Sequence, residues 1–208
     1  RWLEDGDRFL WLSERDGWRH LYLADRFGAS FQLLTPGDYD VIQLEGVDEK
    51  NGKVYFMASP ENPTQRYLYQ VSLNGGTAAR VSPQDQAGVH AYQTSPDGRF
   101  AIHSYSSANQ PLVRDLVDLP GHQVIRSLTE NSALREAIEK LDRKPVEFFR
   151  VDIGDGIELD GWMMSPPRIE PGKKYPLLVF VYGEPAGQTV MDRWGGSRYL
   201  WHLMHNLN

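Results

Sequence analysis

Short hydrophobic runs recur along the first 130 residues, and turn-forming residues separate them. Three of these runs, at residues 8–14, 53–59 and 99–105, resemble one another and are offset by 45 and 46 residues. An Asp-Gly or Asn-Gly pair precedes each run, and such pairs supply the positive φ that tight hairpins need. A period of about 40–50 residues built from short strands is typical of β-propeller blades. The pattern therefore predicts propeller blades over residues 1–130.

Aromatic side chains are the main candidates for the core of these blades, because each removes a large apolar area from water when it is buried. Six of them lie on the expected strands: Trp11, Tyr22, Tyr55, Phe56, Tyr67 and Tyr69. The simplest interpretation places all six in the core.

The strand repeat stops near residue 130, and a helical pattern follows in the expected linker, residues 131–145. Leu134, Ile138 and Leu141 recur there at helical spacing among good helix formers. Ser132 precedes the first of them and is the expected N-cap. We therefore expect a helix that connects two domains.

Residues 146–208 show a third pattern, in which strands and turns lead to a long apolar run. The segments 148–153 and 157–164 flank a Gly-Asp-Gly turn and predict a β-hairpin. The run from Leu177 to Tyr182 predicts a strand buried on both faces, although periodicity alone leaves a buried helix open. A final helix is expected from Arg198 to Asn208. Its apolar side contains Leu200, Leu203, Met204 and Leu207.

Composition narrows the function without identifying it. With 40% hydrophobic residues, 19 Gly and 13 Pro, the chain has the composition of a turn-rich globular protein. A net charge of −6 gives no support for nucleic-acid binding, which normally needs a basic face. The chain has no cysteine, so it contains no disulfide and no thiol nucleophile. It begins at Arg1 and ends inside the last expected helix, so we expect it to be part of a longer protein.

The loop after the apolar run is the strongest candidate for chemistry. In open α/β sheets, ligands bind at the carboxyl ends of the strands, and Tyr182 is the last side chain before a Gly- and Pro-rich turn. A hydroxyl donor aimed at developing negative charge is typically worth roughly 3–4 kcal/mol of barrier. The residues alone leave equally open a structural Tyr182 that bonds a nearby backbone group.

Four stretches occur in a characteristic order along the chain: Glu14–Tyr22, Asn131–Leu134, Lys173–Leu178 and Val181–Gly183. Together they resemble the dipeptidyl peptidase IV branch of the prolyl oligopeptidase serine peptidases. The resemblance implies the last blades of a β-propeller, followed by the opening strands and helix of an α/β-hydrolase domain. It also implies that Tyr182 donates its hydroxyl to the oxyanion of the tetrahedral intermediate.

Two departures from the family pattern concern the catalytic groups. Glu184 stands where the family more often has glycine, and a glutamate is strained if the turn requires positive φ there. The nucleophile is missing, because Gly195–Tyr199 comes near G-x-S-x-G but ends in tyrosine and follows Tyr182 too closely. We therefore interpret Ser197 as an ordinary residue at the start of a helix.

No catalytic or metal-binding set can be assigned among the remaining polar residues. Asp192 and His202 lie on one segment, whereas a catalytic triad assembles from separate loops. The six histidines show no metal-ligand spacing. We expect no cofactor and, in the absence of a Ser-Asp-His set, no peptidase activity from this chain by itself.

The function implied by the resemblance is that of a serine exopeptidase, which removes N-terminal dipeptides from peptides with Pro or Ala in the second position. The parent protein would be a homodimer, would act outside the cytoplasm and would not bind nucleic acid. Two alternatives stay open. One is a related prolyl oligopeptidase or acylaminoacyl peptidase, and the other is a propeller interaction module with a degenerate hydrolase part.

Overall fold

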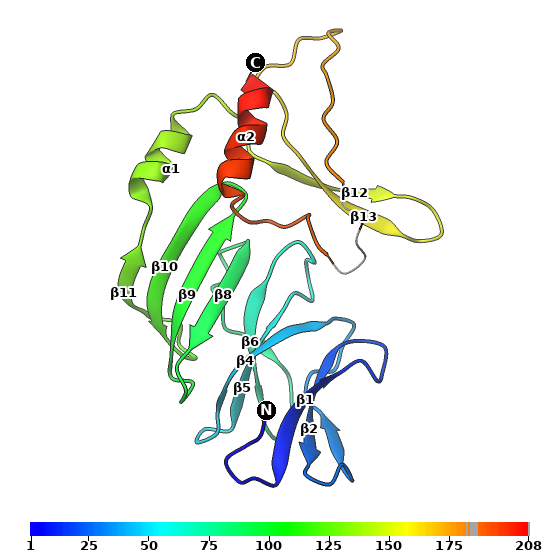
Figure 1. Cartoon of the computed structure of the whole chain (residues 1–208), viewed down its shortest axis with the longest axis vertical. Coiled ribbons are helices and arrows are strands. Elements are labelled where there is room, and N and C mark those ends of the chain that lie inside the picture. Colours follow the sequence, from blue (N-terminus) through cyan, green and yellow to red (C-terminus); the bar gives the residue numbers. More distant parts are fainter. Residues whose placement is uncertain (182, 184–186, 208) are drawn as a thin grey trace.

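The computed structural model of the chain describes residues 1–181, 183 and 187–207 (Figure 1). Three antiparallel sheets come first and occupy the N-terminal end and the middle of the molecule. A helix, a separate β-hairpin and a second helix follow, and they lie at the opposite end. The architecture is therefore mostly antiparallel β.

Each sheet is a meander in which strands adjacent in sequence are also paired. The first sheet contains β1 (Arg8–Ser13), β2 (His20–Asp25) and β3 (Phe31–Leu33). The second contains β4 (Val41–Asp48), β5 (Lys53–Ala58), β6 (Tyr67–Ser72) and β7 (Ala79–Arg80). The third contains β8 (Val89–Thr94), β9 (Phe100–Ser107), β10 (Gln110–Asp118) and β11 (Val124–Thr129). Small antiparallel sheets that succeed one another in this way are consistent with a β-propeller.

The same tight turn precedes β1, β5 and β9, the three strands that carry the sequence repeat. A glycine occupies each turn: Gly6 (φ 67°), Gly52 (φ 63°) and Gly98 (φ 68°). In each case the glycine N–H donates to the carbonyl oxygen three residues earlier, at 3.1, 3.2 and 2.9 Å. The positive φ expected from the Asp-Gly and Asn-Gly pairs is confirmed.

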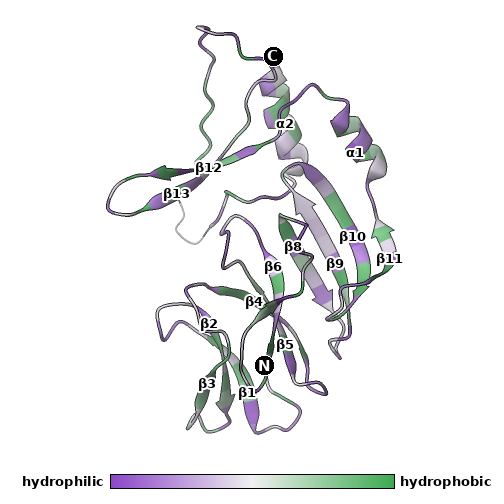
Figure 2. Cartoon of the chain, turned by 180° about the vertical axis from the view of Figure 1, so that it is seen from behind, coloured by the Kyte–Doolittle hydropathy of each residue, from purple (hydrophilic) through white to green (hydrophobic). Residues whose placement is uncertain are grey.

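The second sheet is buried on both faces, because its central strand alternates between two hydrophobic clusters. Val54, Phe56 and Ala58 belong to the cluster shared with the first sheet. Tyr55 and Met57 point the other way, into the cluster shared with the third sheet. This alternation follows from the period-two geometry of a strand. On β10, by contrast, the hydrophobic and hydrophilic residues follow one another in bands (Figure 2), because they occur there in pairs.

Five of the six aromatic residues assigned to the core are buried, with at most 8% of their surface exposed. Trp11 is the exception, at 40% exposure, so that assignment was wrong. Its neighbours Leu10 and Leu12 pack toward the second sheet, so Trp11 alternates to the opposite face of β1. There its ring lies 5.6 Å from that of Phe31 and 5.5 Å from the guanidinium carbon of Arg15.

The helix expected within residues 131–145 is present as α1 (Ser132–Glu139), and its buried residue is Ile138. The N-cap is Asn131 in the left-handed conformation, not Ser132 as expected. The Asn131 side-chain amide donates to the Leu112 carbonyl oxygen at 2.7 Å, so it binds the end of the helix to β10. This tertiary contact has no signature in the local sequence.

The hairpin and the final helix are also present. β12 (Glu147–Asp152) pairs antiparallel with β13 (Glu158–Met163), as predicted. α2 (Gly196–Leu207) begins two residues before the predicted start. Tyr199 and Leu203, four residues apart on one side of α2, are its buried side chains among those described, whereas Leu200 and Met204 are 40% and 51% exposed. The predicted apolar side was therefore only partly correct.

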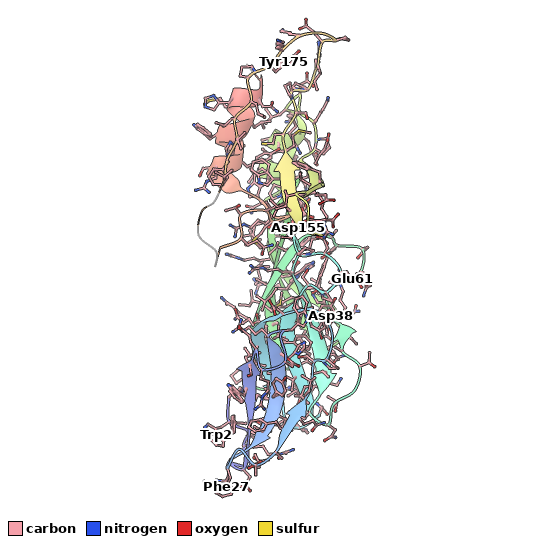
Figure 3. The ribbon with its side chains drawn as sticks, turned by 90° about the vertical axis from the view of Figure 1, so that its right-hand side faces the viewer. Trp2, Phe27, Asp38, Glu61, Asp155 and Tyr175 are labelled. Carbon is pink, nitrogen blue, oxygen red and sulfur yellow. The ribbon has the colours of Figure 1, made fainter. Side chains whose placement is uncertain are left out.

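The apolar run does not form the buried strand that the sequence predicted. Leu177–Val181 is extended but unpaired, and its side chains are 46–83% exposed. A strand needs neighbours for its backbone N–H and C=O groups, and no strand among the described residues lies beside this one. The loop that leads to it passes Tyr175, at the opposite end of the molecule from Trp2 and Phe27 (Figure 3).

Candidate functional site

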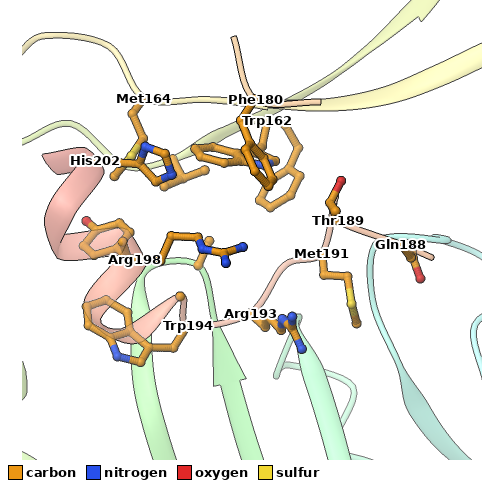
Figure 4. A pocket seen from close by; sticks show the side chains of 15 residues that line it. Trp162, Met164, Phe180, Gln188, Thr189, Met191, Arg193, Trp194, Arg198 and His202 are labelled. Carbon is orange, nitrogen blue, oxygen red and sulfur yellow. The ribbon is translucent and has the colours of Figure 1, made fainter. Parts of the chain in front are cut away.

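The candidate site lies where the C-terminal elements meet the third sheet. Residues 187–195, which we call the junction segment, run from the predicted oxyanion loop to the start of α2 and border a pocket of about 470 Å³. Large aromatic and apolar side chains line part of it: Phe148, Trp162, Met164, Phe180, Met191, Trp194 and Tyr199. Arg193, Arg198 and His202 are its basic residues, and Gln188 and Thr189 add polar groups (Figure 4).

Two polar groups of the pocket, those of His202 and Arg198, lie against aromatic rings. The His202 ring makes an edge contact with Trp162 at 5.6 Å, and the Arg198 guanidinium carbon lies 5.5 Å from the centre of the Phe180 ring. Burial, with a smaller contribution from the charge of Arg198, lowers the pKa of His202. Its imidazole is therefore neutral near pH 7, and its Nε2 atom has no hydrogen-bond partner among the described residues.

Asp192 anchors the junction segment to two sheets at once. Its N–H donates to the Thr64 carbonyl oxygen at 2.8 Å. One carboxylate oxygen accepts from the Ala108 N–H at 2.9 Å, and the other accepts from the Gln65 side-chain amide at 3.0 Å. Thr64 and Gln65 lie in the β5–β6 loop of the second sheet, and Ala108 lies in the β9–β10 turn of the third. One side chain thus fixes three segments.

Two further hydrogen bonds extend this contact on either side of Asp192. The Gln188 side-chain amide donates to the Pro63 carbonyl oxygen at 2.6 Å. The Trp194 N–H donates to Ser106 Oγ at 3.3 Å. The junction segment is consequently bound along most of its length to the β5–β6 loop of the second sheet and to the end of β9 and the β9–β10 turn of the third.

The predicted oxyanion donor is not part of this geometry. Tyr182 and Glu184 lie outside the described residues, so the catalytic role of the first and the effect of the second on the loop stay predictions. The described residues before them, Leu177–Val181, belong to the exposed apolar run.

The other residues considered for chemistry fall into structural positions. Ser197 is exposed in the first turn of α2, in agreement with its interpretation as a helix-start residue. Asp192 is bound to the sheets, and the contacts of His202 are to aromatic rings. No local sequence pattern indicated the anchoring role of Asp192, because its partners lie 84 to 128 residues earlier in the chain.

Three histidines that showed no pattern in the sequence meet in the third sheet. His90 Nδ1 lies 2.9 Å from His103 Nε2, and the His103 and His122 rings are 4.7 Å apart. His122 Nε2 accepts from the Tyr92 hydroxyl or donates to it at 2.8 Å. The register of β8 against β9 brings His90 and His103 together. A sequence-based prediction of that register would have been needed to find the pair.

Neither a metal site nor a membrane span is found in the part of the chain that the structure describes. No group of three or more His, Asp or Glu side chains there has an arrangement that would hold a metal ion. None of the described helices has both the length and the apolar composition needed to cross a membrane.

Comparison with known proteins identifies relatives over most of the chain. The family "Dipeptidyl peptidase IV (DPP IV) N-terminal region" matches residues 1–112. The dipeptidyl peptidase 4 of Trichophyton equinum is 29% identical over 183 residues, and a probable dipeptidyl peptidase 4 of Emericella nidulans is 31% identical over 186. Both matches cover 88% of this chain but 24% of the relative, so the chain spans about a quarter of the length of these proteins.

Solved structures give the same result for the fold. The crystal structure of Porphyromonas gingivalis dipeptidyl peptidase 4 superposes with a TM-score of 0.83 at 32% identity, over 93% of this chain and 27% of that one. A putative dipeptidyl aminopeptidase IV from Bacteroides ovatus superposes with a TM-score of 0.79 at 26% identity, over 97% and 31%. The similarity extends beyond the residues that the family model matches.

Proposed function

Since the chain belongs to the dipeptidyl peptidase IV family, we propose that it is the part of a serine-type dipeptidyl peptidase in which a β-propeller joins an α/β-hydrolase domain. In this proposal residues 1–130 are propeller blades, residues 131–145 are the linker with its helix, and residues 146–208 open the hydrolase domain. The order of three antiparallel sheets, α1, the β12–β13 hairpin and α2 supports this division.

The observation that carries the proposal is the contact of the junction segment with the second and third sheets. Through Asp192, the segment that follows Tyr182 in the chain is bound to loops of two of the sheets that we assign to the propeller. A peptide held by a propeller could therefore meet a hydroxyl donor from the hydrolase side. Such an arrangement suits an exopeptidase, whose substrate must be fixed at its terminus while the reacting bond lies a short distance away.

The proposed reaction is the release of N-terminal dipeptides from peptides with Pro or Ala in the second position. A serine elsewhere in the parent protein attacks the scissile carbonyl carbon, and the Tyr182 hydroxyl donates to the oxygen that becomes negative. A donor of this kind typically contributes roughly 3–4 kcal/mol to the barrier reduction. The parent protein would work without a cofactor, as a homodimer outside the cytoplasm.

The proposal is tested on the full-length parent protein with a chromogenic Gly-Pro amide. We expect the wild type to cleave it, and Tyr182→Phe to lower kcat on the order of a hundredfold with little change in KM. The 208-residue chain by itself should release no product. Wild-type activity that Tyr182→Phe leaves unchanged would make Tyr182 structural.

A wild-type enzyme that leaves the Gly-Pro amide intact would overturn the proposed specificity. Cleavage of an acylaminoacyl amide or of an internal prolyl bond would then assign the parent to a related peptidase. Inactivity on all three substrates would favour the propeller as an interaction module.

A further inference from the structure

We propose that Asp192 is a positioning residue for the peptidase reaction, because it fixes the junction segment, which follows Tyr182 in the chain, against the second and third sheets. This inference rests on the proposed function. Asp192 follows Tyr182 by ten residues and precedes the first residue of α2 by four. Among the contacts of the junction segment described above, those of Asp192 reach both sheets from one residue.

The geometry of the Asp192 contacts fixes position in more than one direction. Its N–H bonds the second sheet, and its carboxylate bonds the Ala108 N–H of the third sheet and the Gln65 amide of the second. All three hydrogen bonds are between 2.8 and 3.0 Å. Because the three partners belong to two different loops, Asp192 cannot shift along either loop without breaking a bond.

The carboxylate is chemically suited to this role. An ionised carboxylate is an acceptor only, and here it faces two N–H donors, one on each oxygen. Hydrogen bonds to a charged acceptor are stronger than those between neutral groups. An asparagine keeps one acceptor oxygen for Ala108 but turns an N–H₂ group toward Gln65, whereas an alanine loses both bonds.

The nearby aromatic contacts make the junction segment stiff on the side of α2. The Trp194 ring lies 4.6 Å from that of the buried Tyr199 in α2, and the Trp194 N–H bonds Ser106 of the third sheet. The chain is therefore held both at Asp192 and at the start of α2, where Trp194 packs against Tyr199. On the N-terminal side of Asp192, the Gln188 amide donates to the Pro63 carbonyl oxygen, so the anchored stretch begins at least four residues before Asp192.

The test is a double-mutant cycle in the full-length parent protein, with the Gly-Pro amide as substrate. If Asp192 acts through Tyr182, Asp192→Ala should lower kcat by about tenfold with KM nearly unchanged, because misplacing a catalytic group mainly affects the transition state. In the Tyr182→Phe background the same change should have less than about a twofold effect, since the hydroxyl that it positions is gone. Asp192→Asn should fall between wild type and Asp192→Ala.

Asp38→Ala serves as the control, because Asp38 is an exposed carboxylate in the loop between β3 and β4 (Figure 3). It should leave kcat at the wild-type value. Thermal unfolding of each variant separates misfolding from mispositioning. If Asp192→Ala does not fold, Asp192→Asn replaces it, because the asparagine keeps the hydrogen bond to Ala108.

Three results would overturn a claim, and they are distinguishable. An inactive wild type overturns the proposed function and this inference with it. Equal kcat for wild type and Tyr182→Phe removes the role of Tyr182. The positioning role alone is overturned if Tyr182→Phe lowers kcat as expected but Asp192→Ala lowers kcat by the same factor in both backgrounds. It is also overturned if Asp192→Ala leaves kcat unchanged in both.

Discussion

His90 Nδ1 lies 2.9 Å from His103 Nε2 inside the third sheet, and the two rings are nearly parallel, at 13°. His90 Nε2 lies 2.9 Å from the Gln86 carbonyl oxygen and must donate to it. The neutral His90 ring therefore accepts at Nδ1, and His103 donates from Nε2. Protonation of His90 would place two donors face to face, so the pair is built for neutral imidazoles.

Acid should destabilise the chain through this pair. Burial lowers the pKa of His90 to about 4 and that of His103 to about 3, against 6.5 for an ordinary histidine. As the pH falls below about 6.5, the unfolded chain takes up protons that the folded chain does not, so the free energy of unfolding decreases. Urea unfolding at pH 7.5, 6.0 and 5.0, followed by tryptophan fluorescence, would measure this decrease.

His103→Gln should weaken this acid sensitivity, because the glutamine amide can still donate to His90 but does not titrate. His205→Gln, at an exposed position of α2, is the matched control and should leave the pH dependence unchanged. Identical pH profiles for wild type and His103→Gln would show that the histidine pair does not govern the acid response.

Glu45 should have the opposite pH dependence. It lies on β4 beside Thr94, whose hydroxyl donates to the Glu45 carbonyl oxygen at 2.8 Å, and burial raises the pKa of its carboxyl to about 7. A raised pKa means that the contribution to stability is present below the ordinary value of 4.5 and is lost as the pH rises through 7.

We therefore expect Glu45→Gln to increase the free energy of unfolding at pH 8 and to change it little at pH 5. The neutral amide removes the need to ionise a half-buried group. Glu61→Gln, at an exposed position, is the control (Figure 3). If both variants respond alike at pH 8, surface charge and not burial accounts for the effect.

The turns and the hairpin could be predicted from the sequence, because they depend on residues that are adjacent in the chain. These are the turns at Gly6, Gly52 and Gly98 and the hairpin around residues 154–156. Whether Leu177–Val181 pairs into a sheet could not be predicted in this way, because a buried strand depends on partner strands far away in sequence. The anchoring contacts of Asp192 were hidden for the same reason, since they join segments that only the packed sheets bring together.

Gly6 and Gly98 allow the steric cost of a Gly→Ala change to be separated from its cost in backbone strain. Gly6 and Gly98 have nearly equal φ, 67° and 68°, so alanine incurs a similar left-handed penalty of about 1–2 kcal/mol at both. A Cβ at Gly6 would meet no atom within 4 Å, whereas at Gly98 it would lie 3.1–3.3 Å from Asp48, including its backbone. Gly98→Ala should therefore destabilise the chain more than Gly6→Ala in urea unfolding. Equal decreases in the free energy of unfolding would mean that the turn at Asp48 shifts to admit the new methyl group without an energetic penalty.

The exposed apolar run should make the 208-residue chain self-associate. Leu177, Val179 and Val181 are 83%, 66% and 78% exposed in an extended, unpaired segment. Extended hydrophobic segments with free backbone groups pair readily with other chains. Light scattering after size-exclusion chromatography should therefore show a mass that rises with protein concentration.

A single charge in this run should reduce the association without loss of stability. Val179→Lys places an ammonium group on the exposed face and removes almost no packing, so the free energy of unfolding should stay within about 0.5 kcal/mol of wild type. Gln84→Lys, at an exposed loop position, adds the same charge elsewhere and should leave the association unchanged. Equal suppression by both lysines would indicate that net charge drives the effect, and no suppression by Val179→Lys would place the contact on another surface, such as an open sheet edge.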